Sequence, residues 1–217
     1  MILSSERPAA AIVAAALRAA VVTVAAVVAV AAVVAVVALA AAPARAADAP
    51  AIKAKAQLCE ACHGPGGNPT DPAIPSLAGQ PKQFITTQLV MYREGRRINE
   101  VMSAIAKDMP NPDINDYGTY FSAQKRVVAA NALPADRAAA GEAVAQRLNC
   151  VQCHGPTLMG LQHIPRIAGQ QADYLRAQLN GFKAGTRFDM DGNMTAAAQP
   201  LTSADIELLS VYLASRP

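Results

Sequence analysis

The spacing of apolar residues along the chain predicts helices, and no segment alternates between apolar and polar positions as a strand would. Ala140, Val144 and Leu148, for example, recur at the interval of one helix face. Glycine and proline collect between such segments and indicate loops over 64–75 and 155–165. The expected helices cover 52–62, 83–93, 137–154 and 172–183, and two more begin after Pro112 and after Thr202-Ser203. The sequence therefore predicts an all-α fold.

Capping residues support several of these helix ends. Gly95 and Gly185 follow the second and fourth expected helices and suit C-terminal caps. Thr202-Ser203 offers an N-cap for the last helix, with Glu207 in its first turns.

The first 46 residues form a separate apolar segment. The run 19–42 carries no charge, Thr23 is its one polar residue, and Ala44-Arg45-Ala46 follows as a cleavage pattern. We expect an export signal that is cut before Ala47. Because the run is long enough to span a bilayer, retention as a membrane anchor is the alternative. Either outcome places the rest of the chain outside the cytoplasm, in the periplasm.

The rest of the chain is duplicated. The segment Ile74-Pro75-Ser76-Leu77-Ala78-Gly79-Gln80 recurs as Ile164-Pro165-Arg166-Ile167-Ala168-Gly169-Gln170, an offset of 90 residues. Downstream matches continue at this offset and then at 92, as far as Tyr120 and Tyr212. Such self-similarity indicates tandem domains, here expected over 47–124 and 135–217 with a linker at 125–134. Each unit is small for an independent core, so a bound group would supply part of its apolar centre.

Charge and composition change once the leader is set aside. The leader inflates the hydrophobic content of 53%, which is therefore no evidence for an integral membrane fold. It also holds three of the 19 Lys and Arg residues and one of the 16 Asp and Glu residues, which leaves 16 against 15. A nearly neutral chain without a basic stripe argues against a nucleic-acid partner.

All four cysteines lie in two copies of one pentapeptide, Cys59-Glu60-Ala61-Cys62-His63 and Cys150-Val151-Gln152-Cys153-His154. C-x-x-C-H is the attachment site of a c-type haem. Two thiols three residues apart on a helical turn can each add to a vinyl group, and the histidine that follows faces the iron. The sequence predicts two covalently bound haem c groups, held through Cys59, Cys62, Cys150 and Cys153.

Two other uses of paired cysteines fit less well. A zinc site would have to join cysteine pairs 91 residues apart and would leave both adjacent histidines unexplained. A thioredoxin-like dithiol would need a βαβ context, which the helical pattern does not offer.

These motifs resemble the dihaem class I cytochromes c of the cytochrome c4 family. The resemblance covers 47–217 and rests on the C-x-x-C-H sites followed by Gly-Pro, and on the P-x-[LI]-A-G-Q, aromatic-x4-Q-L and G-x-R segments with a downstream methionine. It implies two cytochrome c folds, each with iron ligated by histidine and methionine, in a periplasmic electron carrier. By position it implies His63 and His154 as proximal ligands and Met102 and Met194 as distal ligands. It also implies that the carbonyls of Pro75 and Pro165 orient the histidines.

The two candidate methionines recur at matched places, 39 and 40 residues beyond their histidines. The second half has two additional residues before its methionine, so the distal loops should differ. His163 is expected to be a loop residue, and Tyr120 and Tyr212 are expected to pack the terminal helix on the haem helix. The methionines without a counterpart are interpreted as packing residues: Met91, Met109, Met159 and Met190.

Three functions follow from these features. The first is a carrier between a membrane quinol-oxidising complex and a terminal oxidase or reductase. The second is a fixed cytochrome subunit of a periplasmic dehydrogenase or oxidase, which a retained anchor would favour. The third is a dihaem enzyme such as a peroxidase, which needs an open iron position. Because histidine and methionine would fill both axial positions and raise the potential, we expect a non-enzymatic protein with redox donor and acceptor proteins as partners.

Overall fold

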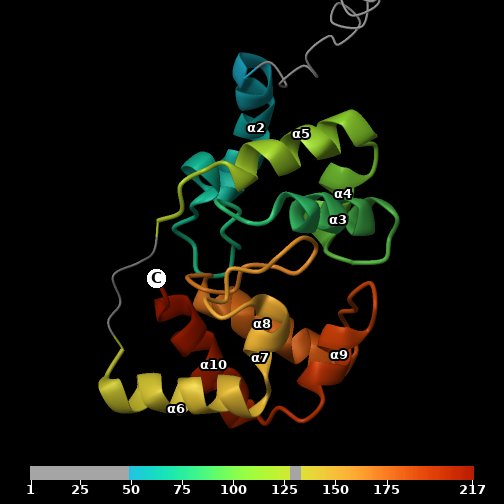
Figure 1. The fold of residues 1–217 in the computed structure, drawn as a ribbon. Coiled ribbons are helices and arrows are strands. Elements are labelled where there is room, and N and C mark those ends of the chain that lie inside the picture. Colours follow the sequence, from blue (N-terminus) through green and yellow to red (C-terminus); the bar gives the residue numbers. More distant parts are fainter. Residues whose placement is uncertain (1–48, 128–132) are drawn as a thin grey trace, which may run out of the picture. The chain divides into compact units, whose positions relative to one another are not determined.

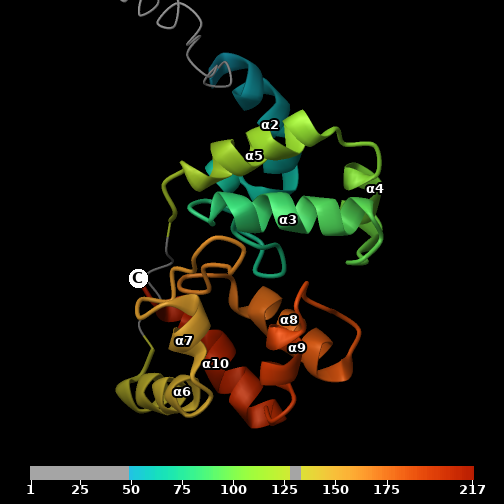
Figure 2. The same cartoon turned by 45° about the vertical axis from the view of Figure 1, so that its right-hand side comes forward.

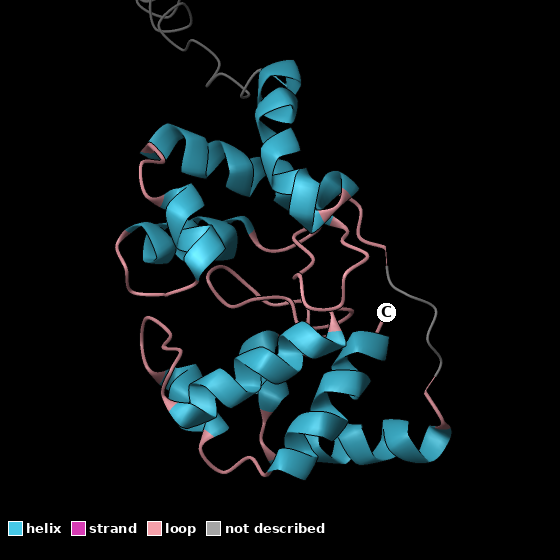
Figure 3. Cartoon of the chain, turned by 180° about the vertical axis from the view of Figure 1, so that it is seen from behind, coloured by secondary structure: helices cyan, strands magenta, loops and turns pink. Residues whose placement is uncertain are grey.

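The computed structural model describes residues 49–127 and 133–217, and its regular elements in these ranges are helices joined by loops (Figures 1 and 3). The all-α prediction is confirmed. The predicted export signal at 1–46 and the middle of the predicted linker, 128–132, lie outside the described residues. Among the residues that are described, no helix is both long and apolar enough to cross a bilayer.

The N-terminal half contains α2 (Ala49–His63), the 3-10 turn η1 (Pro65–Gly67), α3 (Lys82–Arg93), α4 (Glu100–Ala106) and α5 (Asn111–Ser122). Helix α5 packs against both α2 and α3 (Figure 2). Gly118 permits the close contact with α3, since a Cβ at this position would clash with the Thr86 side chain and the Lys82 carbonyl. The core of this half comprises Ile52, Ala56, Ile85, Tyr117 and Phe121.

The C-terminal half repeats this arrangement with α6 (Ala135–Arg147), α7 (Cys150–His154), α8 (Ala172–Ala184), α9 (Asn193–Ala198) and α10 (Ser203–Ser215). Helix α10 packs on α6 and α8 (Figure 1). Gly141 of α6 lies directly against Tyr212, and any Cβ there would overlap this side chain. Tyr212 thus packs the terminal helix as expected, and it belongs to a core that includes Val144, Leu179, Phe182 and Leu209.

Two predicted helix boundaries are wrong. The single helix expected over 137–154 is broken, because Asn149 adopts a left-handed conformation (φ 53°, ψ 34°) between α6 and α7. Asparagine tolerates this conformation better than most residues with a side chain. The helix expected to begin after Pro112 begins at Asn111 instead, with the proline in the first turn, where its missing N–H costs no hydrogen bond.

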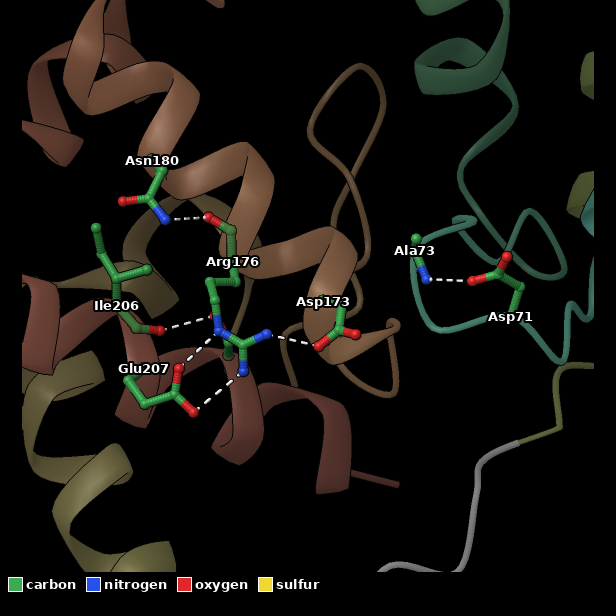
Figure 4. Close-up of polar contacts among 8 residues, drawn as sticks. Asp71, Ala73, Asp173, Arg176, Asn180, Ile206 and Glu207 are labelled. Carbon is green, nitrogen blue, oxygen red and sulfur yellow. Dashed lines mark hydrogen bonds and ion pairs between the residues drawn. The ribbon is translucent and has the colours of Figure 1, made fainter.

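The start of the last helix is confirmed in part. Thr202 is the N-cap of α10 and forms a capping box with Asp205. The Thr202 hydroxyl accepts from the Asp205 N–H, and the Asp205 carboxylate accepts from the Thr202 N–H. Glu207 is not part of the cap. It pairs with Arg176 of α8 at 2.6 Å instead and so links the two helices (Figure 4).

The repeated P-x-[LI]-A-G-Q segments contact each other. The side-chain amide of Gln80 donates to the carbonyl oxygen of Arg166 (2.9 Å) and accepts from its N–H (3.0 Å). In the same way, the side-chain amide of Gln170 donates to the carbonyl oxygen of Ser76 (3.0 Å) and accepts from its N–H (2.7 Å). We call these four hydrogen bonds the glutamine clasp. They tie the loop after one haem motif to the loop after the other, while the domain boundaries 47–124, 125–134 and 135–217 stay a prediction.

Candidate functional site

The four cysteines lie at two equivalent places. Cys59 and Cys62 are on the last turns of α2, and Cys150 and Cys153 are on α7. None of the four forms a disulfide, and in each pair the first is half-buried and the second exposed. Burial raises the pKa of Cys59 to about 11 and also raises the pKa of Cys150. A redox-active dithiol has a lowered thiol pKa, so these sites do not fit that class of protein.

The two histidines of the motifs are buried and oriented alike. Nδ1 of His63 lies 2.9 Å from the carbonyl oxygen of Pro75, and Nδ1 of His154 lies 2.8 Å from that of Pro165. Because a carbonyl only accepts, Nδ1 carries the proton in both rings. Nε2 is therefore left with its lone pair, which is the state in which imidazole binds a metal.

Burial also keeps these imidazoles neutral. His63 is 7% exposed and His154 is 8% exposed. In both, burial lowers the pKa and outweighs the bond to the proline carbonyl, which acts in the opposite direction. Two neutral, oriented imidazoles thus follow the cysteine pairs directly.

The two candidate methionines lie on short helices that the sequence did not predict. Met102 is in α4 and Met194 is in α9, and both are half-buried. Helices of seven and six residues are too short to show a clear apolar period, which is why the pattern does not reveal them. Each places one thioether in the first turn, beside a polar residue that binds the same turn.

That polar residue differs between the halves. Asn99 is the N-cap of α4 and its side chain accepts from the Met102 N–H at 2.9 Å. Asp189, 90 residues later, accepts from the N–H groups of Met194 (2.8 Å) and Thr195 (3.0 Å). Burial alone would raise the pKa of Asp189, but the hydrogen bonds from Thr195 and Met194, together with a contact to Asp191, lower it to about 2. The first turn of α4, which carries Met102, is thus bound by a neutral amide, whereas the first turn of α9, which carries Met194, is bound by a charged carboxylate.

The sequence contains a signal for these two holding residues, although the motifs alone did not reveal them. They occupy the same place in the repeat, at the offset of 90 residues that aligns the preceding motif. Asparagine directly before a helix indicates an N-terminal cap, which Asn99 forms on α4. Asp189 binds the first turn of α9 from outside the cap position, which Gly192 occupies.

The remaining methionines have different surroundings. Met91 is 5% exposed inside the N-terminal half, and Met109 is half-buried against the core of that half. Met190 is 56% exposed, so its interpretation as a packing residue is wrong, whereas Met194 packs against the C-terminal core. This supports Met194 over Met190 as the candidate in the second half. His163 lies in a loop with Nε2 3.8 Å from a carboxylate oxygen of Asp191.

The residues present fit a covalently bound haem c. Each half supplies two free thiols on one helical stretch, an imidazole with an unprotonated Nε2, and a half-buried thioether. A metal cluster of three or more His, Cys, Asp or Glu side chains is not found in the described ranges, which leaves the zinc interpretation without support.

Comparisons with known proteins agree with this chemistry. The family model of cytochrome c matches residues 138–217. The chain is 34% identical to cytochrome c4 of Pseudomonas aeruginosa over 77% of its length and 88% of that protein. It is 36% identical to the thiosulfate dehydrogenase electron acceptor of Thiomonas intermedia, over 77% of this chain and 82% of that protein. The crystal structure of reduced recombinant cytochrome c4 from Pseudomonas stutzeri matches with a TM-score of 0.72 and 32% identity, covering 79% of this chain and all of that one. The chain belongs to the cytochrome c4 family.

Proposed function

We propose that this dihaem electron carrier of the cytochrome c4 family takes electrons from a membrane quinol-oxidising complex and delivers them to a terminal oxidase or reductase in the periplasm. One observation carries the proposal: both halves hold the same set of candidate ligands, an oriented imidazole and a half-buried thioether. Two matched sites of this kind support electron transfer rather than substrate chemistry, because a histidine and a methionine at each iron would leave no open position for a substrate.

In this proposal the residues of each half have separate tasks. Cys59 and Cys62 anchor one haem c, and Cys150 and Cys153 anchor the other. His63 and His154 bind iron through Nε2, and the proline carbonyls fix their ring orientation. Met102 and Met194 would bind the two irons through their thioether sulfurs. Bound haem c supplies a single-electron couple, which methionine ligation shifts to positive potential.

The surface supports contacts with redox proteins. Ile98 and Phe188 occupy equivalent places in the repeat and are 85% and 55% exposed. Val101 and Met190, close to the candidate methionines in sequence, are exposed as well. Exposed apolar residues of this size suit brief docking, in which a small patch is covered and released.

A second candidate function is the electron acceptor of a periplasmic dehydrogenase. The relative from Thiomonas intermedia, named as the electron acceptor of thiosulfate dehydrogenase, favours it. The same ligand set would serve this task, since only the donor differs.

Stopped-flow reduction of the oxidised protein separates the two candidates. The purified protein is mixed with a quinol-oxidising complex and quinol, or with thiosulfate dehydrogenase and thiosulfate, at equal concentrations. We expect the faster reduction with the quinol-oxidising complex. Faster reduction by thiosulfate dehydrogenase would replace the first proposal with the second, and reduction by neither would contradict both.

A further inference from the structure

Two arginines from the two halves meet at one glutamine. Arg97 and Arg187 occupy the same place in the repeat, two residues after Gly95 and Gly185. Nη2 of Arg97 donates to Oε1 of Gln178 at 3.0 Å, and Nη1 of Arg187 donates to the same oxygen at 2.5 Å. Two guanidinium groups therefore share one neutral acceptor, and we call them the arginine pair.

Aromatic rings hold both members of the pair in place. The Arg97 guanidinium lies 4.7 Å from the ring centre of Tyr92, and that of Arg187 lies 4.4 Å from the ring centre of Phe182. These two rings are also equivalent in the repeat. These cation–π contacts hold each guanidinium over a ring and leave its N–H groups available for hydrogen bonds.

Within the described residues, the arginine pair has no carboxylate partner at ion-pair distance. The other acceptors of Arg97 are also neutral, Gln88 Oε1 at 2.6 Å and the Tyr174 hydroxyl at 3.0 Å. Arg97 is only 8% exposed. Arg187 has a buried Nε with no acceptor among these residues. Arg176, by contrast, is bound by both Asp173 and Glu207 (Figure 4).

The electrostatics around the pair favour an anion. Burial and the neighbouring charge of Arg97 lower the pKa of Arg187 to about 10. Burial alone would raise the pKa of Tyr174, but the two arginines lower it. A buried cation without a negatively charged partner is costly, and here two lie together with neutral acceptors alone among the described residues. A carboxylate would offset this cost and would accept from the unpaired Nε.

Haem c brings carboxylates of its own, the two propionates of each macrocycle. Arg97 precedes Met102 by five residues, and Arg187 precedes Met194 by seven, so each lies on the segment that leads to a candidate iron ligand. Resting on the haem sites proposed above, we infer that the arginine pair binds haem propionate carboxylates and thereby raises the reduction potential of at least one iron. A nearby positive charge favours the ferrous state, which carries one positive charge less than the ferric state.

Replacement of each arginine by glutamine tests the inference. Arg97→Gln and Arg187→Gln should each lower at least one potential by about a tenfold shift in the ferrous-to-ferric ratio, which is ~59 mV for one electron. Arg176→Gln, with its carboxylate partners on the surface, should leave both potentials unchanged. Spectroelectrochemical titration at constant ionic strength measures them. If the two pair variants shift no more than Arg176→Gln, the inference is wrong.

Vibrational spectra distinguish propionate binding from a general effect of positive charge. Redox-induced infrared difference spectra should show shifted carboxylate bands in both pair variants and unchanged bands in Arg176→Gln. Arg97→Lys and Arg187→Lys keep the charge but lose the two-pronged bond, so the bands should shift while the potentials change little. Unshifted bands in the lysine variants would overturn the inference, even if a glutamine variant fails to accumulate.

Two outcomes would assign the effect elsewhere. If added phosphate at constant ionic strength changes the potentials of the unmodified protein, the pair binds a free anion and not a propionate. If a glutamine variant loses the near-infrared sulfur-to-iron band, its lowered potential reflects a lost methionine ligand. Both results would overturn the inference while leaving the proposed donor and acceptor to be tested separately.

Discussion

Gln80 and Gln170 make the same contact in opposite directions, each with its side-chain amide paired to the backbone of one residue in the other half. Their backbone partners are Arg166 and Ser76. These two residues are equivalent in the repeat, and each directly follows the proline whose carbonyl orients a histidine. The glutamine clasp therefore joins the backbone segments that fix both candidate imidazoles, and stability and haem geometry should be linked through it.

Replacing Gln80 by Ala should destabilise the protein. The change removes two hydrogen bonds and leaves the buried N–H and carbonyl of Arg166 unpaired, which costs about 1–3 kcal/mol of unfolding free energy. Denaturant unfolding followed by far-UV circular dichroism measures this loss. Gln83→Ala, an exposed glutamine on α3, serves as the matched control and should stay near zero. Equal stability of the two variants would show that the clasp contributes nothing.

Replacing Met194 by Ala should lower the potential of one haem, remove about half of the near-infrared sulfur-to-iron band and open that iron to carbon monoxide. Met190→Ala is the control, since Met190 is exposed and four residues away. It should leave all three properties nearly unchanged. The assignment fails if the Met190 variant shows these changes and the Met194 variant does not.

Replacing Asp189 by Asn should raise the potential of the second haem. It removes a negative charge bound to the first turn of α9, and it keeps a side-chain oxygen that can accept from the Met194 N–H, as Asn99 accepts from the Met102 N–H in the first half. We expect a shift of up to about 59 mV, a tenfold change in the ferrous-to-ferric ratio. The reciprocal change, Asn99→Asp, should lower the potential of the first haem. Shifts of the same sign in both variants would refute the charge argument.

The capping box of α10 should make stability depend on acid pH. The backbone N–H of Thr202, followed by its hydroxyl, lowers the pKa of Asp205, and Arg147 acts in the same direction. A carboxyl with a lowered folded pKa contributes stability above its unfolded pKa of about 3.9, and this is lost as the pH falls through the folded value.

Asp205→Asn should therefore reduce the free energy of unfolding by about 1 kcal/mol at pH 7 and by less at pH 3, below the unfolded pKa, where part of the stabilisation is already lost. Asp108→Asn, an exposed aspartate between α4 and α5, should show no such difference. A deficit of Asp205→Asn that is as large at pH 3 as at pH 7 would contradict this origin of the stabilisation.

The sequence predicted those features that depend on local chemistry or on repetition. The cysteine motifs and the matched histidines and methionines could be found because each of them occurs in both halves of the sequence. The N-cap at Thr202 was predicted from residue type alone. The break at Asn149 was not, because the apolar series runs at a helical interval as far as Leu148 and only the left-handed backbone of the next residue interrupts the helix.

Contacts between the halves could not be predicted either. The glutamine clasp joins residues 86 and 94 positions apart, and nothing in the local pattern around Gln80 or Gln170 specifies the partner. The arginine pair has the same origin. Its two members are visible in the repeat as G-x-R, but their shared acceptor Gln178 emerges only from the packing of α8. Tertiary placement thus decides which polar residues of a duplicated chain face each other.

The intact mass of the exported protein under denaturing conditions tests the central claim most directly. Thioether bonds survive denaturation, so a chain with two intact C-x-x-C-H sites should keep both haems. The account predicts the mass of the polypeptide plus two haem groups, with haem absorbance in the same chromatographic peak. A mass with one haem or none, or haem that separates from the chain on denaturation, would contradict it.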